Sequence, residues 1–482
     1  IVLGVLWHLV PGLPVFRVPP ALALAIFLPP LLASAAYEVP LGAFRANLRP
    51  ITLLAVGLVG VTMAAVAVAA RATAPWVPWA AAFVLGAIVA PPDAVAATSV
   101  GGELGLENRL VTILEGEGLV NDATALVFYQ LAVEAVVSGE FGWGHAAVEL
   151  ARSAPLGAIV GLAAGWGTAA VRRRLDEPAL EVVISLIVPY IAYLAADALG
   201  GSAVIAVVAL GFFLRRHATE IGTPRTRLTA RLVWRTLGFL ITGLVFVLVG
   251  LEIGEISTRQ ALTRDLLVDA AIVSGTVIVV RMAWMYVVPH VTRWLAHRGE
   301  QAPSWRELTV LGWAGMRGVV SLALALAVPA TTAAGAPFPG RDRLILICFA
   351  VIAATLVLQG ATLAPLIRAL GVADPGARRR DEREARREAA AAARERLARL
   401  AGEGRISADD RAAAERLLAR EAGDGDSGLA PGVRRALRAA LDAERDAVLR
   451  RRDDGALDGE SALRLELEID LDEIRAGGDA AL

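Results

Sequence analysis

The sequence contains no lysine, so all 47 of its basic residues are arginine. Cysteine is nearly absent too, because the one copy, Cys348, lies in an apolar run. A single cysteine excludes a disulfide framework and a cysteine-based metal site. The stretch after residue 370 contains no aromatic ring on which a nucleic-acid base could stack, and its acids outnumber its arginines. Both absences argue against a nucleic-acid partner.

The 482 residues are 56% hydrophobic, and the formal net charge is only −1. The charges are unevenly distributed along the chain. Residues 371–482 carry 22 arginines and 26 acids, whereas residues 1–370 carry 25 arginines and 22 acids. This contrast predicts two regions in different solvents. We expect a transmembrane domain over 1–370 and a charged helical tail over 371–482.

Twelve apolar segments in the first region are candidates for membrane helices, since a bilayer core about 30 Å thick needs about 20 apolar residues as helix. The first segment is short and starts at Ile1 without a methionine, so we expect an incomplete amino terminus. The segments cover approximately 1–10, 21–37, 50–70, 77–99, 110–137, 155–171, 180–199, 202–214, 232–252, 267–289, 308–330 and 344–370.

Arginine asymmetry predicts the orientation of these segments. Loops after even-numbered segments hold fourteen arginines and the other loops hold seven. Because loops rich in basic residues remain in the cytoplasm, the tail is predicted to be cytoplasmic and the protein to lie in the inner (plasma) membrane. The tail itself predicts helices over about 378–402, 407–421, 431–451 and 459–475, serving regulation or assembly.

Charged residues inside apolar segments are costly in a membrane, so each one is a functional hypothesis. Seven residues qualify by position: Asp93, Glu115, Glu117, Asp122, Asp197, Arg281 and Arg317.

Asp93 follows two consecutive prolines in the middle of a predicted span. Pro91 and Pro92 cannot donate backbone hydrogen bonds, so the helix is predicted to break there. Irregular backbone at membrane depth survives only inside protein or beside a cavity. A carboxylate beside such a break suits a small cation.

Three carboxylates lie within eight residues of one another in the segment 110–137. Glu117 and Asn121 are four residues apart and share one helix face, and Asp122 lies next to Asn121. The three acids Glu115, Glu117 and Asp122 cannot all be ionised in hydrocarbon without partners. Arg317 remains protonated when buried and therefore needs an anion. We predict a Glu117–Arg317 ion pair, which leaves Asp93 and Asp122 to bind either a cation or protons.

The stretches GAIVAPPDAVA, LEGEGLVNDATALV and GWAGMRGVVSLALALAVP together closely resemble the sodium/proton exchangers of the NhaP/NHE type. The resemblance covers nearly all of residues 1–370. It implies an all-α, polytopic NhaA/NhaP-like inverted-repeat fold with broken crossing helices, and a homodimer. It also implies that Asp122 is the principal site for Na+ and H+, that Asn121 is its structural neighbour, and that Asp93 stands where the broken helices cross. An Asn-Asp pair is typical of the electroneutral exchangers.

Two positions depart from the family pattern. Gly118 stands where members often have serine, and Pro92 stands where many have threonine. Both changes remove a side-chain oxygen from the neighbourhood of the predicted monovalent cation site formed by Asp122 and Asp93. Further accessory positions are Glu115, Thr124 and Arg281.

Several alternatives remain open at the level of sequence. The same site could exchange K+ for H+, or the protein could be a passive channel. Asp93 and Asp122 could instead be the paired aspartates of an intramembrane protease, although Asp122 lacks the Gly-x-Gly-Asp context and such a dyad has no need of Glu117 and Arg317. A serine protease using Ser202 is weaker still, because no histidine is suitably placed. We expect a transporter rather than an enzyme, without a cofactor.

Overall fold

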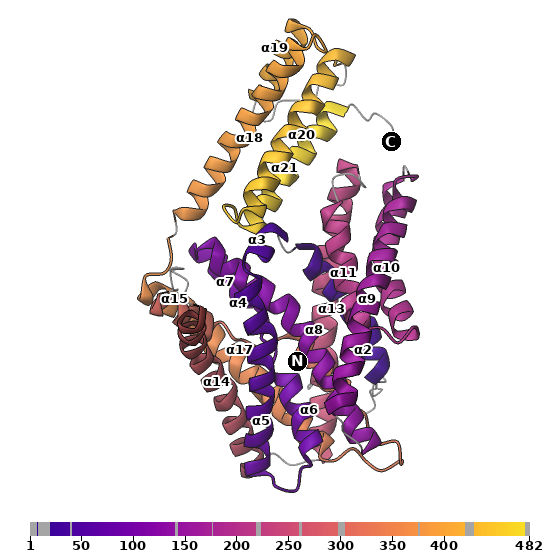
Figure 1. Ribbon diagram of the computed structural model, residues 1–482, viewed down its shortest axis with the longest axis vertical. Coiled ribbons are helices and arrows are strands. Elements are labelled where there is room, and N and C mark those ends of the chain that lie inside the picture. The colour runs from indigo at the N-terminus through magenta and orange to yellow at the C-terminus, as the bar shows by residue number, and fades with distance from the viewer. Residues whose placement is uncertain are drawn as a thin grey trace.

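The computed structural model describes residues 7, 20–38, 41–139, 143–175, 177–217, 223–259, 263–296, 304–374, 376–419 and 429–477. Within these ranges the chain is helical apart from turns, connections and one isolated β-bridge between Thr331 and Pro337. The all-α prediction is therefore confirmed, and the fold consists of packed helices of very different lengths (Figure 1). The predicted first segment, 1–10, lies outside the described residues except for Trp7.

The helices of the first 370 residues follow one another in chain order, and a short π-helix, η1, joins α4 to α5. They are α2 (Pro20–Glu38), α3 (Leu41–Ala46), α4 (Leu48–Thr52), η1 (Leu53–Leu58), α5 (Val59–Thr73), α6 (Trp79–Val89), α7 (Ala94–Leu104), α8 (Asn108–Ser138), α9 (Trp143–Arg172), α10 (Pro178–Ala198), α11 (Ala203–Arg216), α13 (Pro224–Arg259), α14 (Arg264–Ala296), α15 (Trp305–Trp313), α16 (Val319–Leu326) and α17 (Arg341–Leu370).

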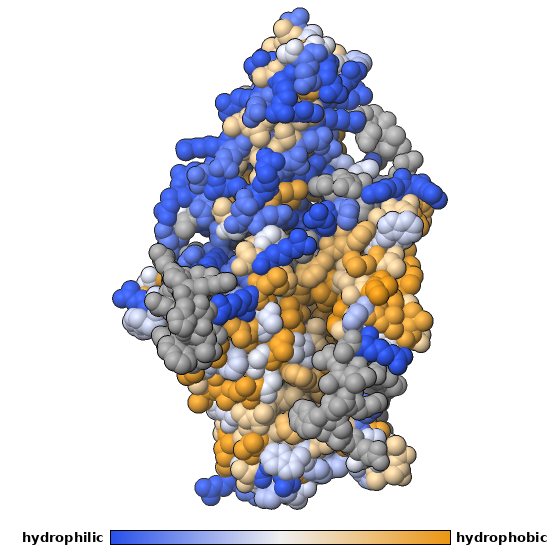
Figure 2. All heavy atoms as spheres, in the orientation of Figure 1, coloured by the Kyte–Doolittle hydropathy of each residue, from blue (hydrophilic) through white to orange (hydrophobic). Residues whose placement is uncertain are grey.

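Seven helical stretches of the described chain are long and apolar enough to cross a membrane. They are Leu48–Thr73, Asn108–Ser138, Arg152–Arg172, Pro178–Ala198, Pro224–Ile256, Arg264–Pro289 and Arg341–Leu370. Their outer surfaces are apolar: in Figure 2 the lower part of the molecule is largely orange, whereas the tail above it is blue. Such a belt is the surface that a bilayer requires, so the protein is a membrane protein.

Two spans are interrupted in the middle. The first runs through α6 and α7, which are separated by residues 90–93, in agreement with the break predicted from the two prolines. The second runs through α15 and α16, which are separated by residues 314–318. That interruption falls within the segment 308–330 and contains no proline, but it includes Gly315 and Gly318. Both interruptions are buried or nearly so, as membrane depth requires.

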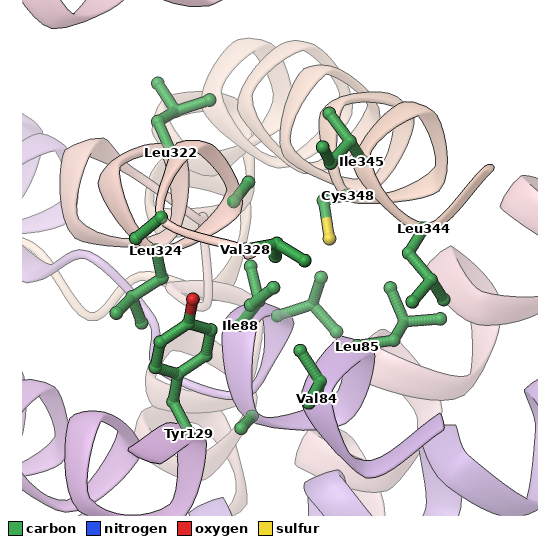
Figure 3. Packing of buried hydrophobic residues seen from close by; sticks show 14 of the residues in the cluster. Val84, Leu85, Ile88, Tyr129, Leu322, Leu324, Val328, Leu344, Ile345 and Cys348 are labelled. Carbon is green, nitrogen blue, oxygen red and sulfur yellow. The ribbon is translucent and has the colours of Figure 1, made fainter. Parts of the chain in front are cut away.

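The membrane helices pack as two groups. Helices α2, α9, α10 and α11 contact mainly one another, and together with α13, which packs on α10 and α2 but also on α16, they form what we call the scaffold group. The remaining helices from α4 to α8 and from α14 to α17 form the site group, which contains both interrupted spans. Within the site group, α6, α8, α16 and α17 enclose a dense apolar core around Ile88, Leu324 and Cys348 (Figure 3). Cys348 is fully buried there and acts as a small packing residue.

The tail continues directly from α17, which ends where Gly371 adopts a left-handed conformation (φ 64°) that favours glycine. It forms α18 (Ala377–Gly402), α19 (Ala408–Ala419), α20 (Pro431–Asp453) and α21 (Gly459–Gly477), each ending within two residues of its predicted range. These helices share an apolar core of their own, which includes Leu397, Leu441 and Leu465. In Figure 1 they stand above the ends of α3 and α7.

Candidate ion-binding site

The two interrupted spans meet at their breaks. The backbone N–H of Asp93 donates a hydrogen bond of 2.6 Å to the carbonyl of Met316, which links the non-helical segments directly. The guanidinium of Arg317 donates to the carbonyl of Ala90, the residue that follows α6. That carbonyl lies at the negative end of the half-helix dipole, where a cation is favoured. The crossing therefore satisfies backbone groups that the two breaks release.

Asp93 lies directly against the second break. A Cβ added at Gly318 would fall only 1.6 Å from Oδ2 of Asp93, so the carboxylate occupies the space that the glycine leaves open. Asp93 also immediately precedes α7, whose first residue is Ala94. Its side chain is partly buried. A larger residue at position 318 could not coexist with this placement.

Helix α8 brings the second half of the candidate site to the crossing. The Asn121 side-chain nitrogen donates to the carbonyl of Pro92 at 3.1 Å, and the residue is fully buried. Its Oδ1 atom is buried and has no partner among the described residues. Asp122, next along the helix, is close enough to Asp93 for their negative charges to interact. Asp93, Asn121 and Asp122 are thus brought together.

Glu117 is paired, but not with the predicted arginine. Arg281 on α14 forms a bidentate ion pair with it, in which Nη2 donates to Oε2 at 2.9 Å and Nη1 donates to Oε1. Nη2 also donates to the carbonyl of Leu311 at 3.0 Å. Both charged side chains are only 1% exposed. The predicted Glu117–Arg317 pair is therefore wrong in its cation.

Tertiary packing explains why Glu117 pairs with Arg281 and not with Arg317. Arg281 passes over the second break, where Gly315 has no side chain to obstruct it: a Cβ there would lie 2.4 Å from the Arg281 side chain. Arg317 is fully buried as well, but it is directed to the end of α6 and its backbone N–H donates to Thr355 at 3.2 Å. Both arginines stand in apolar segments, so the sequence did not distinguish them.

The other accessory positions have different surroundings. The Thr124 hydroxyl donates to the carbonyl of Val120 within its own helix at 2.9 Å. Gly118 faces the start of α7, because a Cβ there would lie 2.8 Å from Cβ of Ala94. Glu115 is partly buried and lines a cavity between α8 and the tail. Asp197, by contrast, is exposed at the end of α10 and takes no part in the crossing.

Three buried polar residues near the crossing were not predicted. Thr355 accepts the Arg317 N–H, and the Gln359 amide and the Ser321 hydroxyl are buried without partners within the described part of the chain. Their only sequence signal is an uncharged polar side chain inside an apolar span, which is too common to single out a site. Among the described residues, no group of three or more His, Cys, Asp or Glu side chains could hold a metal ion.

Comparison with known proteins gives a consistent result. The family described as "Sodium/hydrogen exchanger, transmembrane" matches residues 6–369. An uncharacterized Na+/H+ exchanger of Mycobacterium tuberculosis is 33% identical over 98% of this chain and 90% of its own length. The sodium, potassium, lithium and rubidium/H+ antiporter of Bacillus pumilus is 30% identical over 66% of this chain and 49% of its own length.

Among solved structures, the sodium proton antiporter MjNhaP1 of Methanocaldococcus jannaschii at pH 8 has a similar fold. The TM-score is 0.57 at 17% sequence identity, and the match covers 77% of this chain and 91% of that one. This match confirms the overall NhaP-type fold predicted from the sequence.

Proposed function

The chain belongs to the sodium/hydrogen exchanger family, and on this premise we propose that it exchanges Na+ for H+ by competition of the two ions at Asp122, assisted by Asp93. Each carboxylate oxygen accepts either a proton or a coordination bond to a cation. A cation and a proton that compete for one site are transported in opposite directions when the site faces each side of the membrane in turn. Raised pH favours the cation, and lowered pH displaces it.

The observation that carries this proposal is the charge balance at the crossing. Three carboxylates, Asp93, Glu117 and Asp122, stand beside two arginines, Arg281 and Arg317. With all five ionised the cluster carries a single negative charge. One proton or one monovalent cation makes it neutral, and a neutral cluster is far cheaper to carry through a low-dielectric barrier than a charged one. This balance supports a one-for-one, electroneutral exchange.

The choice of cation rests on which oxygens are available. Asp122, Asp93 and the unpartnered Oδ1 of Asn121 are hard ligands of the kind that Na+ and K+ prefer. Gly118 and Pro92 contribute no side-chain oxygen, so backbone carbonyls and water would complete the coordination shell. A loosely completed shell also favours K+/H+ exchange as a second candidate. The B. pumilus relative, named for transport of sodium, potassium, lithium and rubidium, supports this second candidate.

Alternating exposure of the site is proposed to arise from movement of the site group against the scaffold group. The two groups share part of one buried core, where α2 and α13 pack on α16, but the contacts of each group are mostly internal, and this division supports such a movement. We further propose that the protein is a homodimer in the inner membrane, with its tail in the cytoplasm. Because the family consists of transporters, the intramembrane protease function weighed for Asp93 and Asp122 is set aside.

A dye assay tests the function directly. The purified full chain is reconstituted in liposomes that contain a pH-sensitive fluorophore and an acidic interior. Addition of Na+ outside is expected to discharge the proton gradient, with K+ and Li+ as separate arms. The response should be unaffected by valinomycin-clamped membrane potential, since the exchange is electroneutral. A cation flux without proton movement would instead identify a channel and overturn the proposal.

Gly318→Ala is expected to reduce exchange at least about tenfold, because the added Cβ would overlap the Asp93 carboxylate and displace it. Gly243→Ala is the matched control, since a Cβ at that membrane position on α13 meets nothing within 4 Å. Both variants are measured in the same dye assay after the folded fraction has been equalised by size-exclusion chromatography. Equal rates for the two variants would show that the position of Asp93 does not matter.

A further inference from the structure

A cavity of about 810 Å³ lies between the membrane helices and the tail. Its membrane-side walls include Thr98 on α7 and Glu115 on α8. Thr98 is five residues from Asp93 and Glu115 is seven residues from Asp122, which at 1.5 Å per residue correspond to about 7.5 Å and 10 Å along the helices. The cavity therefore lies on the tail side of the candidate site, within about two helical turns of its carboxylates.

The tail bounds this cavity from above. The turn between α20 and α21, with Gly455, Ala456 and Asp458, lines the cavity together with Arg451 and Arg452 at the end of α20. The end of α20, just before this turn, packs closely on α3: a Cβ at Gly42 would lie 2.3 Å from the carbonyl oxygen of Asp453. The tail therefore forms one wall of the cavity on the side away from the membrane helices.

Acidic residues of α21 hold the tail on the scaffold group. Arg215 at the end of α11 pairs with Glu466 at 2.9 Å. Arg227 at the start of α13 pairs with Asp470 at 2.5 Å, and Arg445 of the tail binds the same carboxylate at 2.6 Å. The side chains of Glu466 and Asp470 are 8% and 1% exposed. Breaking partly buried pairs of this kind is costly, so the contact is specific rather than a loose surface attraction.

Other tail residues bind the site group. Asn108 at the start of α8 donates to Asp381 at 3.3 Å, and Arg378 donates to the carbonyl of Gly102 on α7 at 3.4 Å. The N–H of Asp374 donates to the carbonyl of Gly105 at 3.0 Å. The contacts of Asn108 and Gly102 fall on α8, which carries Asp122, and on α7, which begins directly after Asp93. The tail thus bridges the scaffold group and the site group across the mouth of the cavity.

We propose that the tail is an intramolecular clamp, which docks by its acidic α21 face on the arginines of α11 and α13 and must release before the site group can move and the cavity can open. The proposal rests on the exchange function proposed above. A body that is bonded to both moving parts adds its docking free energy to the barrier between the two conformations. Weakening the contact is therefore expected to accelerate exchange, and locking it to stop exchange.

A reversible disulfide between the tail and α3 tests whether holding the tail in its docked position stops exchange. In the full chain with Cys348→Ala, the pair Ala43→Cys and Gly455→Cys joins α3 to the α20–α21 turn. A Cβ at Gly455 would lie 3.7 Å from that of Ala43, within the range of disulfides. Oxidation is expected to lower the dye-assay rate at least about tenfold, and dithiothreitol to restore it. The two single-cysteine variants are the controls, and they also measure any strain at Gly455, whose φ is +75°.

The effect of weakening the docking is tested by Arg227→Ala, which removes the ion pair between Arg227 on α13 and Asp470 on α21. Its rate is expected to rise at least about twofold above that of Arg225→Ala, an exposed neighbour on the same helix. The clamp is overturned if the fully cross-linked protein exchanges as fast as the same protein after reduction with dithiothreitol. It is also overturned if Arg227→Ala exchanges no faster than Arg225→Ala. If the reduced double-cysteine protein and the unmodified chain both fail to exchange, the proposed function fails and the clamp with it.

Discussion

Replacing Asp122 by asparagine is expected to lower cation/proton exchange to the rate of protein-free liposomes. Asparagine keeps the shape of the side chain but has neither the negative charge nor a titratable proton. The cluster at the crossing would then be neutral with no ion bound, because Glu117 and Asp93 balance Arg281 and Arg317. A neutral cluster gains nothing from one further cation or proton, so both fluxes should stop together. Proteoliposome dye assays with Na+, K+ and Li+ measure this.

Glu134→Gln is the matched control, since this carboxylate lies on the same helix α8 but is exposed. It should exchange at the unmodified rate. Asp93→Asn is expected to reduce exchange severely by the same change in charge. A normal exchange rate for Asp122→Asn would overturn the competition mechanism, whatever the controls show.

Replacing Arg281 by methionine is expected to destabilise the protein by about 3–5 kcal/mol, the usual cost of leaving a buried charge without its partner. Glu117 would retain a carboxylate that is 1% exposed and has lost both of its donors. The apparent melting temperature in detergent, followed by fluorescence-detected size exclusion, measures the loss. Arg368→Met, at an exposed arginine near the end of α17, should leave the melting temperature unchanged.

A double-mutant cycle distinguishes the pair from its rival. Glu117→Met combined with Arg281→Met removes both charges and should be less destabilised than either single change. The same cycle with Arg317 in place of Arg281 should show a smaller coupling, because no hydrogen bond joins Arg317 to Glu117. A larger coupling to Arg317 would restore the pairing predicted from the sequence.

The site shows where sequence reasoning succeeds and where it stops. The break before Asp93 follows from Pro91 and Pro92 themselves, since a missing N–H is a property of the residue and not of its surroundings. The second break, at 314–318, depends on packing against the first through Asp93 and Met316, and glycines alone do not predict it. Because the two breaks stabilise each other, the second one can be recognised only in the three-dimensional structure.

The glycine at position 118 gives a second example. From the sequence alone, Gly118 indicates only that the serine hydroxyl common in the family is missing. In the structure, a Cβ at that position would lie 2.8 Å from Cβ of Ala94, so the start of α7 lies in the space that a side chain at position 118 would need. The sequence shows the missing oxygen, and only the structure shows that the glycine also permits the close approach of α7 and α8.

By itself, the sequence determined that the chain crosses a membrane, that a charged helical tail follows, and that carboxylates stand inside the spans. These features depend on local composition, periodicity and proline, which act through the bilayer and the backbone alone. Tertiary structure decided which arginine neutralises Glu117 and where the tail docks. Both outcomes depend on contacts between residues more than a hundred positions apart, Glu117 with Arg281 and Arg227 with Asp470, and the energy of a buried charge is set by whatever partner the fold brings to it.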